Sequence, residues 1–145
     1  MATTCIARLT LTGDFEPDVV TNKVGIEPTR IWRKGDRIGR RSRLYEYSGW
    51  SIHSRKEESY ELQVQVKKLI SQIGNKWSLI AAVRKEMDLD AEIACSIIIV
   101  GTAPWIHFDP DVLELFVEMG AEIDVDIEAF SEDFGEDDTS DGSAN

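Results

Sequence analysis

Two short segments of nearly the same sequence stand far apart in this 145-residue chain. Residues 15–20 are Phe-Glu-Pro-Asp-Val-Val and residues 108–113 are Phe-Asp-Pro-Asp-Val-Leu, and a glycine follows each at Gly25 and Gly120. Proline favours the first position of a helix and glycine the position after its end, so each segment predicts a helix. Each also follows a predicted strand that ends in glycine. An internal strand–helix repeat is one interpretation, and chance convergence on helix-start chemistry is the other.

The remaining apolar pattern predicts a mixture of strands and helices. Alternation of apolar and polar residues predicts strands at 3–12, 44–54 and 121–128, and the nearly continuous apolar run at 91–101 predicts a central strand. In the last strand we expect Ile123, Val125 and Ile127 to face the core. Helices are predicted at 17–24, 59–73, 76–87 and from Pro110 to Gly120.

This order of elements predicts the α+β class. The expected architecture is a ferredoxin-like sandwich, with a mostly antiparallel sheet and helices on one face. Residues 1–130 are predicted to form one domain, and the acidic residues 131–145 a disordered tail. Residues 26–42, rich in glycine and arginine, are expected to form a long loop.

The chain lacks the apolar stretches of a signal peptide or a membrane span, and its two cysteines, Cys5 and Cys95, lie in predicted strands. We therefore expect a cytoplasmic protein with reduced thiols and no membrane contact. Cys5, Cys95, His53 and His107 have no spacing typical of zinc ligands, and no catalytic motif occurs. The expectation is a protein that is not an enzyme and that has neither metal nor cofactor.

Charge is divided between the two parts of the chain. All 16 Lys and Arg residues lie at or before Lys85, whereas nine of the 27 Asp and Glu residues lie there, which leaves +7 before residue 86 and −18 after it. Such a dipolar distribution predicts steering of charged partners and disfavours general nucleic-acid binding by a chain of net charge −11.

The acidic part supplies candidate residues for binding a basic protein partner. Those on the last predicted helix and strand are Glu114, Glu118, Glu122, Asp124, Asp126 and Glu128. The four on the strand share one face, and a flat row of carboxylates cannot surround a cation. A solvated strand face and a docking surface for the chain's own basic loop are the alternatives.

The basic loop supplies candidates for an anion or nucleotide site. They are Arg30, Trp32, Arg33, Lys34, Arg37, Arg40, Arg41 and Arg43. Arginine binds phosphate and carboxylate through paired hydrogen bonds, and tryptophan can stack on a base. The alternative is that these cations fold onto the acidic part of the chain and neutralise it.

Several short motifs resemble a bacterial family of unknown function. They are Gly25-Ile26-Glu27-Pro28-Thr29, Trp32-Arg33-Lys34-Gly35-Asp36, Gly49-Trp50-Ser51 and the closing Gly120-Ala121-Glu122-Ile123-Asp124-Val125-Asp126. Together they resemble domain of unknown function 4279 over about residues 3–127. The resemblance implies the extent of the domain and a bacterial cytosolic setting, and it implies no catalytic residues.

These observations favour a non-catalytic interaction protein. The most specific hypothesis is an immunity-type inhibitor whose acidic half binds a basic partner such as a nuclease toxin. A sensor domain that binds a small anion or nucleotide at residues 30–43 is the alternative, and self-association as a homodimer stays open.

Overall fold

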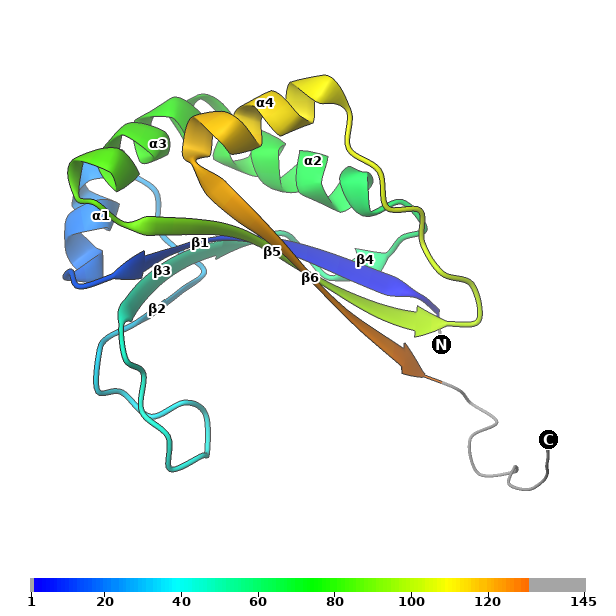
Figure 1. Cartoon of the computed structure of the whole chain (residues 1–145), viewed down its shortest axis with the longest axis horizontal. Helices are drawn as coiled ribbons and strands as arrows, with labels where there is room; N and C mark the ends of the chain where they lie inside the picture. The colour runs from blue at the N-terminus through cyan, green and yellow to red at the C-terminus, as the bar shows by residue number, and fades with distance from the viewer. Residues whose placement is uncertain (1, 131–145) are drawn as a thin grey trace.

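The computed structural model describes residues 2–130, which form one twisted sheet with helices over one of its faces (Figure 1). The strands are β1 (Thr4–Gly13), β2 (Arg30–Trp32), β3 (Ser48–His53), β4 (Glu57–Glu58), β5 (Asp90–Val100) and β6 (Ala121–Phe130). They lie in the order β2-β3-β1-β5-β6, and the short β4 pairs with β1. All neighbours are antiparallel except β5 and β6, which are parallel.

The helices confirm the predicted class. They are α1 (Pro17–Val24), α2 (Leu62–Ile73), α3 (Trp77–Glu86) and α4 (Pro110–Met119), with a short 3₁₀ turn (Gly74–Lys76) between α2 and α3. Apart from the short β4, the elements up to β5 follow one another as β1-α1-β2-β3-α2/α3-β5. In the sheet, β3 and β1 lie between β2 and β5. Both orders are those of a ferredoxin-like sandwich. Helix α4 and strand β6 extend this unit by one parallel strand.

The core lies between the sheet and the helices. Leu9 and Leu11 of β1 pair in register with Ile52 and Trp50 of β3, and all four side chains are buried against the helices. Helix α2 contributes the buried stripe Leu62, Val66, Leu69 and Ile73, whose spacing of three and four residues places it on one side of the helix. The alternate residues of the strands therefore form the other, open face of the sheet.

The repeated segments have the same local structure. Pro17 and Pro110 each occupy the first turn of a helix, and Gly25 and Gly120 each end one with a left-handed φ, 74° and 66° respectively. The connections that follow differ. Strand β3 lies between β1 and β2, whereas β5 and β6 are direct neighbours. The repeat thus holds for the strand–helix segment and does not extend to the strand that follows each helix.

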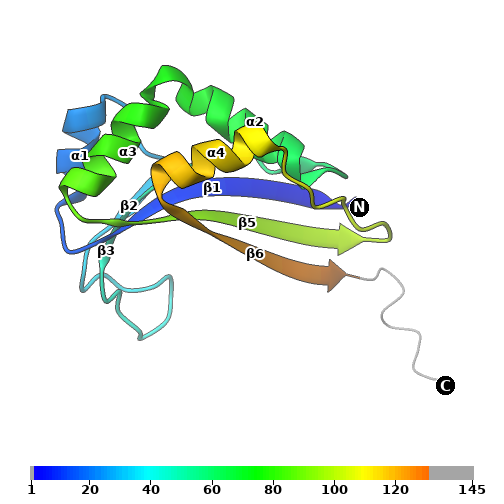
Figure 2. The ribbon, with the colours of Figure 1, turned by 45° about the horizontal axis from the view of Figure 1, so that its top comes forward.

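Three expectations about individual segments were wrong. Ile123 and Ile127, predicted to face the core, are 40% and 55% exposed. Their register with Ile93 and Ile97 places them on the helix side of the sheet, but β6 is the edge strand and the helix layer covers little of it (Figure 2). Val125, the third residue predicted to face the core, is partly buried against it. In addition, the predicted loop at 26–42 contains strand β2, and the strand predicted at 44–54 begins only at Ser48.

Within residues 2–130, no helix has the length and hydrophobicity that crossing a membrane requires. The predicted acidic tail, residues 131–145, lies outside the described residues.

Candidate functional site

The open face of the sheet collects polar side chains from five strands. Its residues are those that alternate with the core, among them Arg8 and Thr10 on β1, Arg30 and Trp32 on β2, Ser51 and His53 on β3, Glu92 and Ser96 on β5, and Glu122, Asp124, Asp126 and Glu128 on β6. Among residues 2–130, the segment between β2 and β3 extends away from the helices on this side of the sheet (Figure 1). The face is basic on the β2–β1 side and acidic on the β6 side, so it carries part of each predicted charged surface.

An aromatic stack marks the basic side. The ring of Trp32 lies directly against Gly49. A Cβ atom added at position 49 would be only 2.0 Å from that ring. Tyr45 stacks on Trp32 at 5.1 Å between ring centroids, and the Arg30 guanidinium lies 5.0 Å from the Trp32 centroid and donates to the Tyr45 hydroxyl. Arginine is thus held on an aromatic platform, as cation–π geometry favours.

A hydroxyl–imidazole chain lies beside this stack. The hydroxyls of Thr10 and Ser51 are 2.9 Å apart, and Nε2 of His53 is 3.0 Å from the Ser51 hydroxyl. Arg8, the register partner of His53, donates to the Ser96 hydroxyl at 2.9 Å. Burial lowers the pKa of His53, and the charges of Arg8 and Arg30 lower it further.

The segment between β2 and β3 forms an ordered extension. Backbone bonds from Gly35 to Tyr45, from Tyr45 to Asp36 and from Ile38 to Arg43 tie its two sides together. The predicted cations Lys34, Arg37, Arg40, Arg41 and Arg43 lie on this extension and are exposed. They do not converge on the basic side of the open face, and Arg30 and Trp32 are the predicted anion-site residues that do.

Arg33 is held by acidic residues of α1 and its cap. Its guanidinium donates to Glu16 at 2.7 and 2.9 Å and to Asp18 at 3.2 Å. Within residues 2–130, no ion pair joins residues 30–43 to the acidic part after residue 85. The alternative that the basic loop neutralises the acidic half is therefore not seen in the described residues.

The Arg33–Glu16 pair predicts a pH dependence. The hydrogen bond from Arg33 lowers the pKa of Glu16 from 4.5 to about 2. Because the folded-state pKa is lowered, the pair stabilises the fold above pH 4.5, and this contribution is lost as the pH falls toward 2. In Arg33→Gln we expect the Glu16 carboxyl, followed by NMR titration, to return toward its ordinary pKa. Arg37→Gln is the matched control and should leave Glu16 unchanged.

The six predicted acidic partner residues do not form one patch. Glu122, Asp124, Asp126 and Glu128 lie on the open face of β6, but Glu114 and Glu118 lie on α4, on the helix side. Ser78 of α3 donates to Glu118. Glu92 of β5 instead joins the row, and its carboxylate and those of Glu122 and Asp124 all lie within 4.8 Å of one another. Three carboxylates, of which Glu122 and Asp124 are exposed and Glu92 is half-buried, fall short of the ligand set that a hard cation requires.

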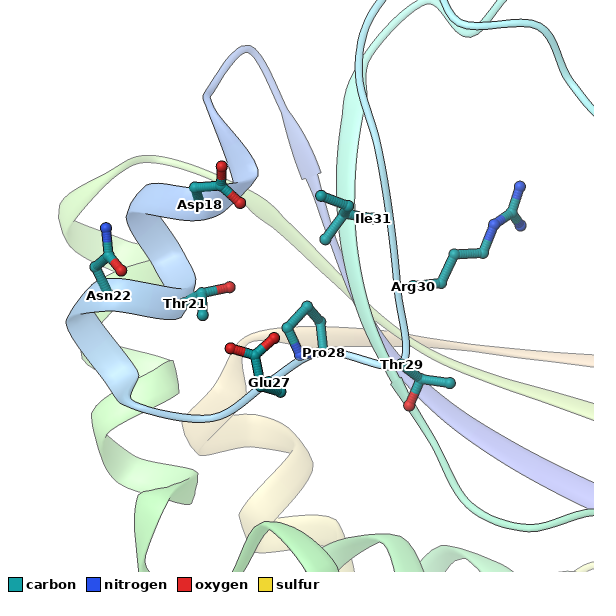
Figure 3. Close-up of a pocket in the computed structure, with 8 residues that line it drawn as sticks. All are labelled: Asp18, Thr21, Asn22, Glu27, Pro28, Thr29, Arg30 and Ile31. Atoms are coloured by element: carbon teal, nitrogen blue, oxygen red, sulfur yellow. The ribbon is translucent and has the colours of Figure 1, made fainter.

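A cavity of about 430 Å³ lies between α1 and the segment that leads into β2 (Figure 3). Its lining is mostly polar and consists of Asp18, Thr21, Asn22, Glu27, Pro28, Thr29, Arg30 and Ile31. The Arg30 side chain extends away from α1, whereas Glu27 and Thr21 face the space between the two segments. Two carboxylates in the lining disfavour an anionic ligand here, so the cavity is distinct from the basic side of the open face.

The cysteines and histidines do not assemble into one site. Cys5 and Cys95 are buried on the helix side of the sheet, whereas His53 lies on the open face. Burial raises the pKa of both thiols, that of Cys95 to about 11, as for unreactive structural cysteines. His107 is 3.0 Å from the Asp109 carboxylate and stacks on Trp105.

The sequence analysis missed Arg8, Tyr45 and Glu92, and it considered His53 only for zinc binding or for a thiol–imidazole pair with a cysteine. Arg8 could have been found from the sequence, because it is the one charged residue of its predicted strand and it alternates with the apolar residues. Nothing in the sequence indicated that His53 would lie near Arg30, since this depends on which strands become neighbours.

Fold and surface together define a ferredoxin-like α+β domain, extended by α4 and β6, whose uncovered sheet face separates basic from acidic residues. The chain belongs to the family described as Domain of unknown function (DUF4279), whose model matches residues 3–130. No curated protein and no solved structure matches it.

Proposed function

We propose that this chain is a non-catalytic protein-binding domain of the bacterial cytoplasm, of the immunity-protein type, that binds a basic partner along strand β6. The observation that supports the proposal is the composition of this edge strand. It is 10 residues long, carries four carboxylates on one face, and exposes Ile123 and Ile127 on the other.

An edge strand presents unpaired backbone groups to an incoming strand. Strand β6 pairs only with β5 among residues 2–130, so its outer edge is open there. Partners that add a strand to such an edge gain main-chain hydrogen bonds, and alternate side chains supply specificity. The acidic row favours lysine or arginine at alternate positions of the partner, and Ile123 and Ile127 favour apolar residues between them.

The same acidic row on β6 argues against a homodimer that forms through this strand. Two antiparallel copies of β6 would place Glu122, Asp124, Asp126 and Glu128 of one copy beside those of the other. Like charges on adjacent strands destabilise the pairing. A basic partner removes this repulsion and gains faster association through long-range attraction.

Charge reversal tests the proposal. We expect Asp124→Lys combined with Asp126→Lys to weaken the affinity for the captured partner on the order of a hundredfold, because attraction becomes repulsion. The matched control, Glu114→Lys combined with Glu118→Lys, makes the same change of charge on α4 and should leave affinity nearly unchanged. The partner would be captured from host lysate, and affinities measured by calorimetry at two salt concentrations.

Two outcomes would contradict the proposal. Either the β6 variant binds as tightly as the unaltered protein, or the α4 variant loses as much affinity as the β6 variant. Protection of β6 amides from hydrogen exchange in the complex is the accompanying expectation, because strand addition engages the backbone.

A sensor domain that binds a small anion or nucleotide is a second candidate function. The observation in its favour is the Arg30 guanidinium held against the stacked rings of Trp32 and Tyr45 on the open face. Thermal stabilisation by phosphates or nucleotides that is lost in Arg30→Gln would support it. Stabilisation that persists in this variant would exclude the basic side of the open face as the site.

A further inference from the structure

We propose that the open face carries a binding site for the phosphate group of a small molecule, formed by Arg8, Arg30 and His53 around the paired hydroxyls of Thr10 and Ser51. The site rests on the second candidate function and specifies its residues and ligand class. It uses no residue of β6, so it can fail or succeed independently of partner binding.

Three adjacent strands bring the cationic groups to one place. Arg8 of β1 is the register partner of His53, and Arg30 of β2 is the register partner of Ser51, two positions from His53 on β3. Neighbouring strands are about 4.8 Å apart, so one small anion can lie within reach of long side chains from all three. The three side chains share the open face because their neighbours Leu9, Ile31 and Ile52 face the core.

The two arginines keep donors available for a ligand. Arg8 uses one nitrogen on the Ser96 hydroxyl, and Arg30 uses one on the Tyr45 hydroxyl. Within residues 2–130, neither arginine forms an ion pair with a carboxylate. A guanidinium has five N–H groups, so each arginine can still make a forked contact with an oxyanion.

The hydroxyl pair forms the floor between these groups. Ser51 and Thr10 are only 1% and 8% exposed although no helix of the described chain covers this face. Their hydrogen-bond chain ends at Nε2 of His53 and fixes the position of the ring. A fixed imidazole beside two arginines is preorganised for an anion, which lowers the entropy lost on binding.

His53 supplies a direct reporter of an anion. The charged groups that lower its pKa are Arg8 from β1 and Arg30 from β2, and the nearest acid of β5, Glu92, is in register with Thr10. The negative charge of a bound dianion would offset the positive charges of both arginines and would stabilise the protonated imidazole of His53. Binding should therefore raise the pKa of His53, and by linkage the affinity should be higher below this pKa than above it.

A phosphate monoester fits these charges best among small anions. Two arginines and one protonated histidine can match a dianion, and the Trp32–Tyr45 stack offers a wall for a planar group such as a base. Free phosphate and a nucleoside monophosphate share the charged group. They differ in the planar part, which only the stack would recognise.

The test follows the two histidines by NMR in tag-free protein. Sulfate, which stays a dianion over the titration range, and adenosine monophosphate are the probes, with ionic strength matched by chloride. We expect both probes to raise the pKa of His53 and to leave His107 unchanged, and we expect the affinity for sulfate to be roughly tenfold higher below the His53 transition than above it. Stronger binding of the monophosphate than of sulfate would assign a nucleotide, and equal binding a simple phosphate.

Variants test which residues form the site. Arg8→Gln and Arg30→Gln should each weaken binding about tenfold or more, Arg8→Lys less, and Arg40→Gln on the extension should have no effect. The proposal is overturned if neither probe changes the titration of His53, if both histidines respond equally, or if the response survives in both glutamine variants. Asp124→Lys with Asp126→Lys should retain the response, which separates this site from β6.

Discussion

Replacing Trp50 by alanine is expected to lower the free energy of unfolding by about 3–5 kcal/mol, as other large-to-small changes of buried aromatic residues do. Trp50 is fully buried on β3, and its indole nitrogen donates to the Thr21 hydroxyl of α1 at 3.0 Å. The alanine variant would leave a cavity between the sheet and α1 and remove that hydrogen bond. Urea unfolding followed by circular dichroism measures the change.

Trp50→Phe separates packing from hydrogen bonding. Phenylalanine keeps most of the apolar volume but cannot donate to Thr21, so we expect a smaller loss of about 1–2 kcal/mol. Thr21→Val removes the same bond from the other side and should have little further effect in the Trp50→Phe background. An alanine variant as stable as the phenylalanine variant would contradict the role of Trp50 as the packing link between β3 and α1.

Gly49→Ala is expected to destabilise the fold by about 1–3 kcal/mol, the usual cost of overpacking. The added Cβ would lie 2.0 Å from the Trp32 ring, so the ring must leave its place on β3. Because Arg30 and Tyr45 both stack on that ring, we also expect the anion response of His53 to weaken. Urea unfolding and the histidine titration report the two effects separately.

A double variant identifies the clash as the cause. Trp32→Ala removes the ring that the new methyl group would meet, so adding Gly49→Ala to Trp32→Ala should cost much less stability than Gly49→Ala alone. If the two changes were additive, the clash would not explain the destabilisation, and the altered backbone preference of alanine would remain as the cause.

The two faces of the sheet have different roles. The helix side holds the core, and Trp50 belongs to it, whereas Gly49 immediately before it faces the aromatic stack. Successive residues of one strand point to opposite faces. Substitutions one position apart on β3 therefore test stability in one case and the geometry of the open face in the other.

Local chemistry explains which elements could be predicted. Helix α1 has the predicted bounds, because Pro17 and Gly25 specify its start and end within a few residues. Helix α2 ends where Gly74 predicted, but it begins at Leu62 rather than Ser59, since no side chain caps its start. The short strand β2 was missed because three residues among glycines and arginines have no readable alternation.

The candidate site was only partly predictable. Arg30 and Trp32 lie on the open face of the sheet, but Arg33 is held by Glu16 and Asp18, and the remaining loop cations lie on the extension. For the acids, alternation along β6 placed four together, while Glu114 and Glu118 lie across the sheet on α4. The charge of a residue, read from the sequence, does not predict on which face of the fold the residue will lie.

The sequence by itself determined the helices and the long strands, the α+β class, the separation of charge and the family, because turn residues, periodicity and motifs act over short distances. Only the tertiary structure decided that β6 is a largely uncovered edge, that Ile123 and Ile127 are exposed, and that Arg8, Arg30 and His53 meet on one face. The physical reason is strand order. Which strands become neighbours depends on packing between residues far apart in the chain, and that order sets every contact across the sheet.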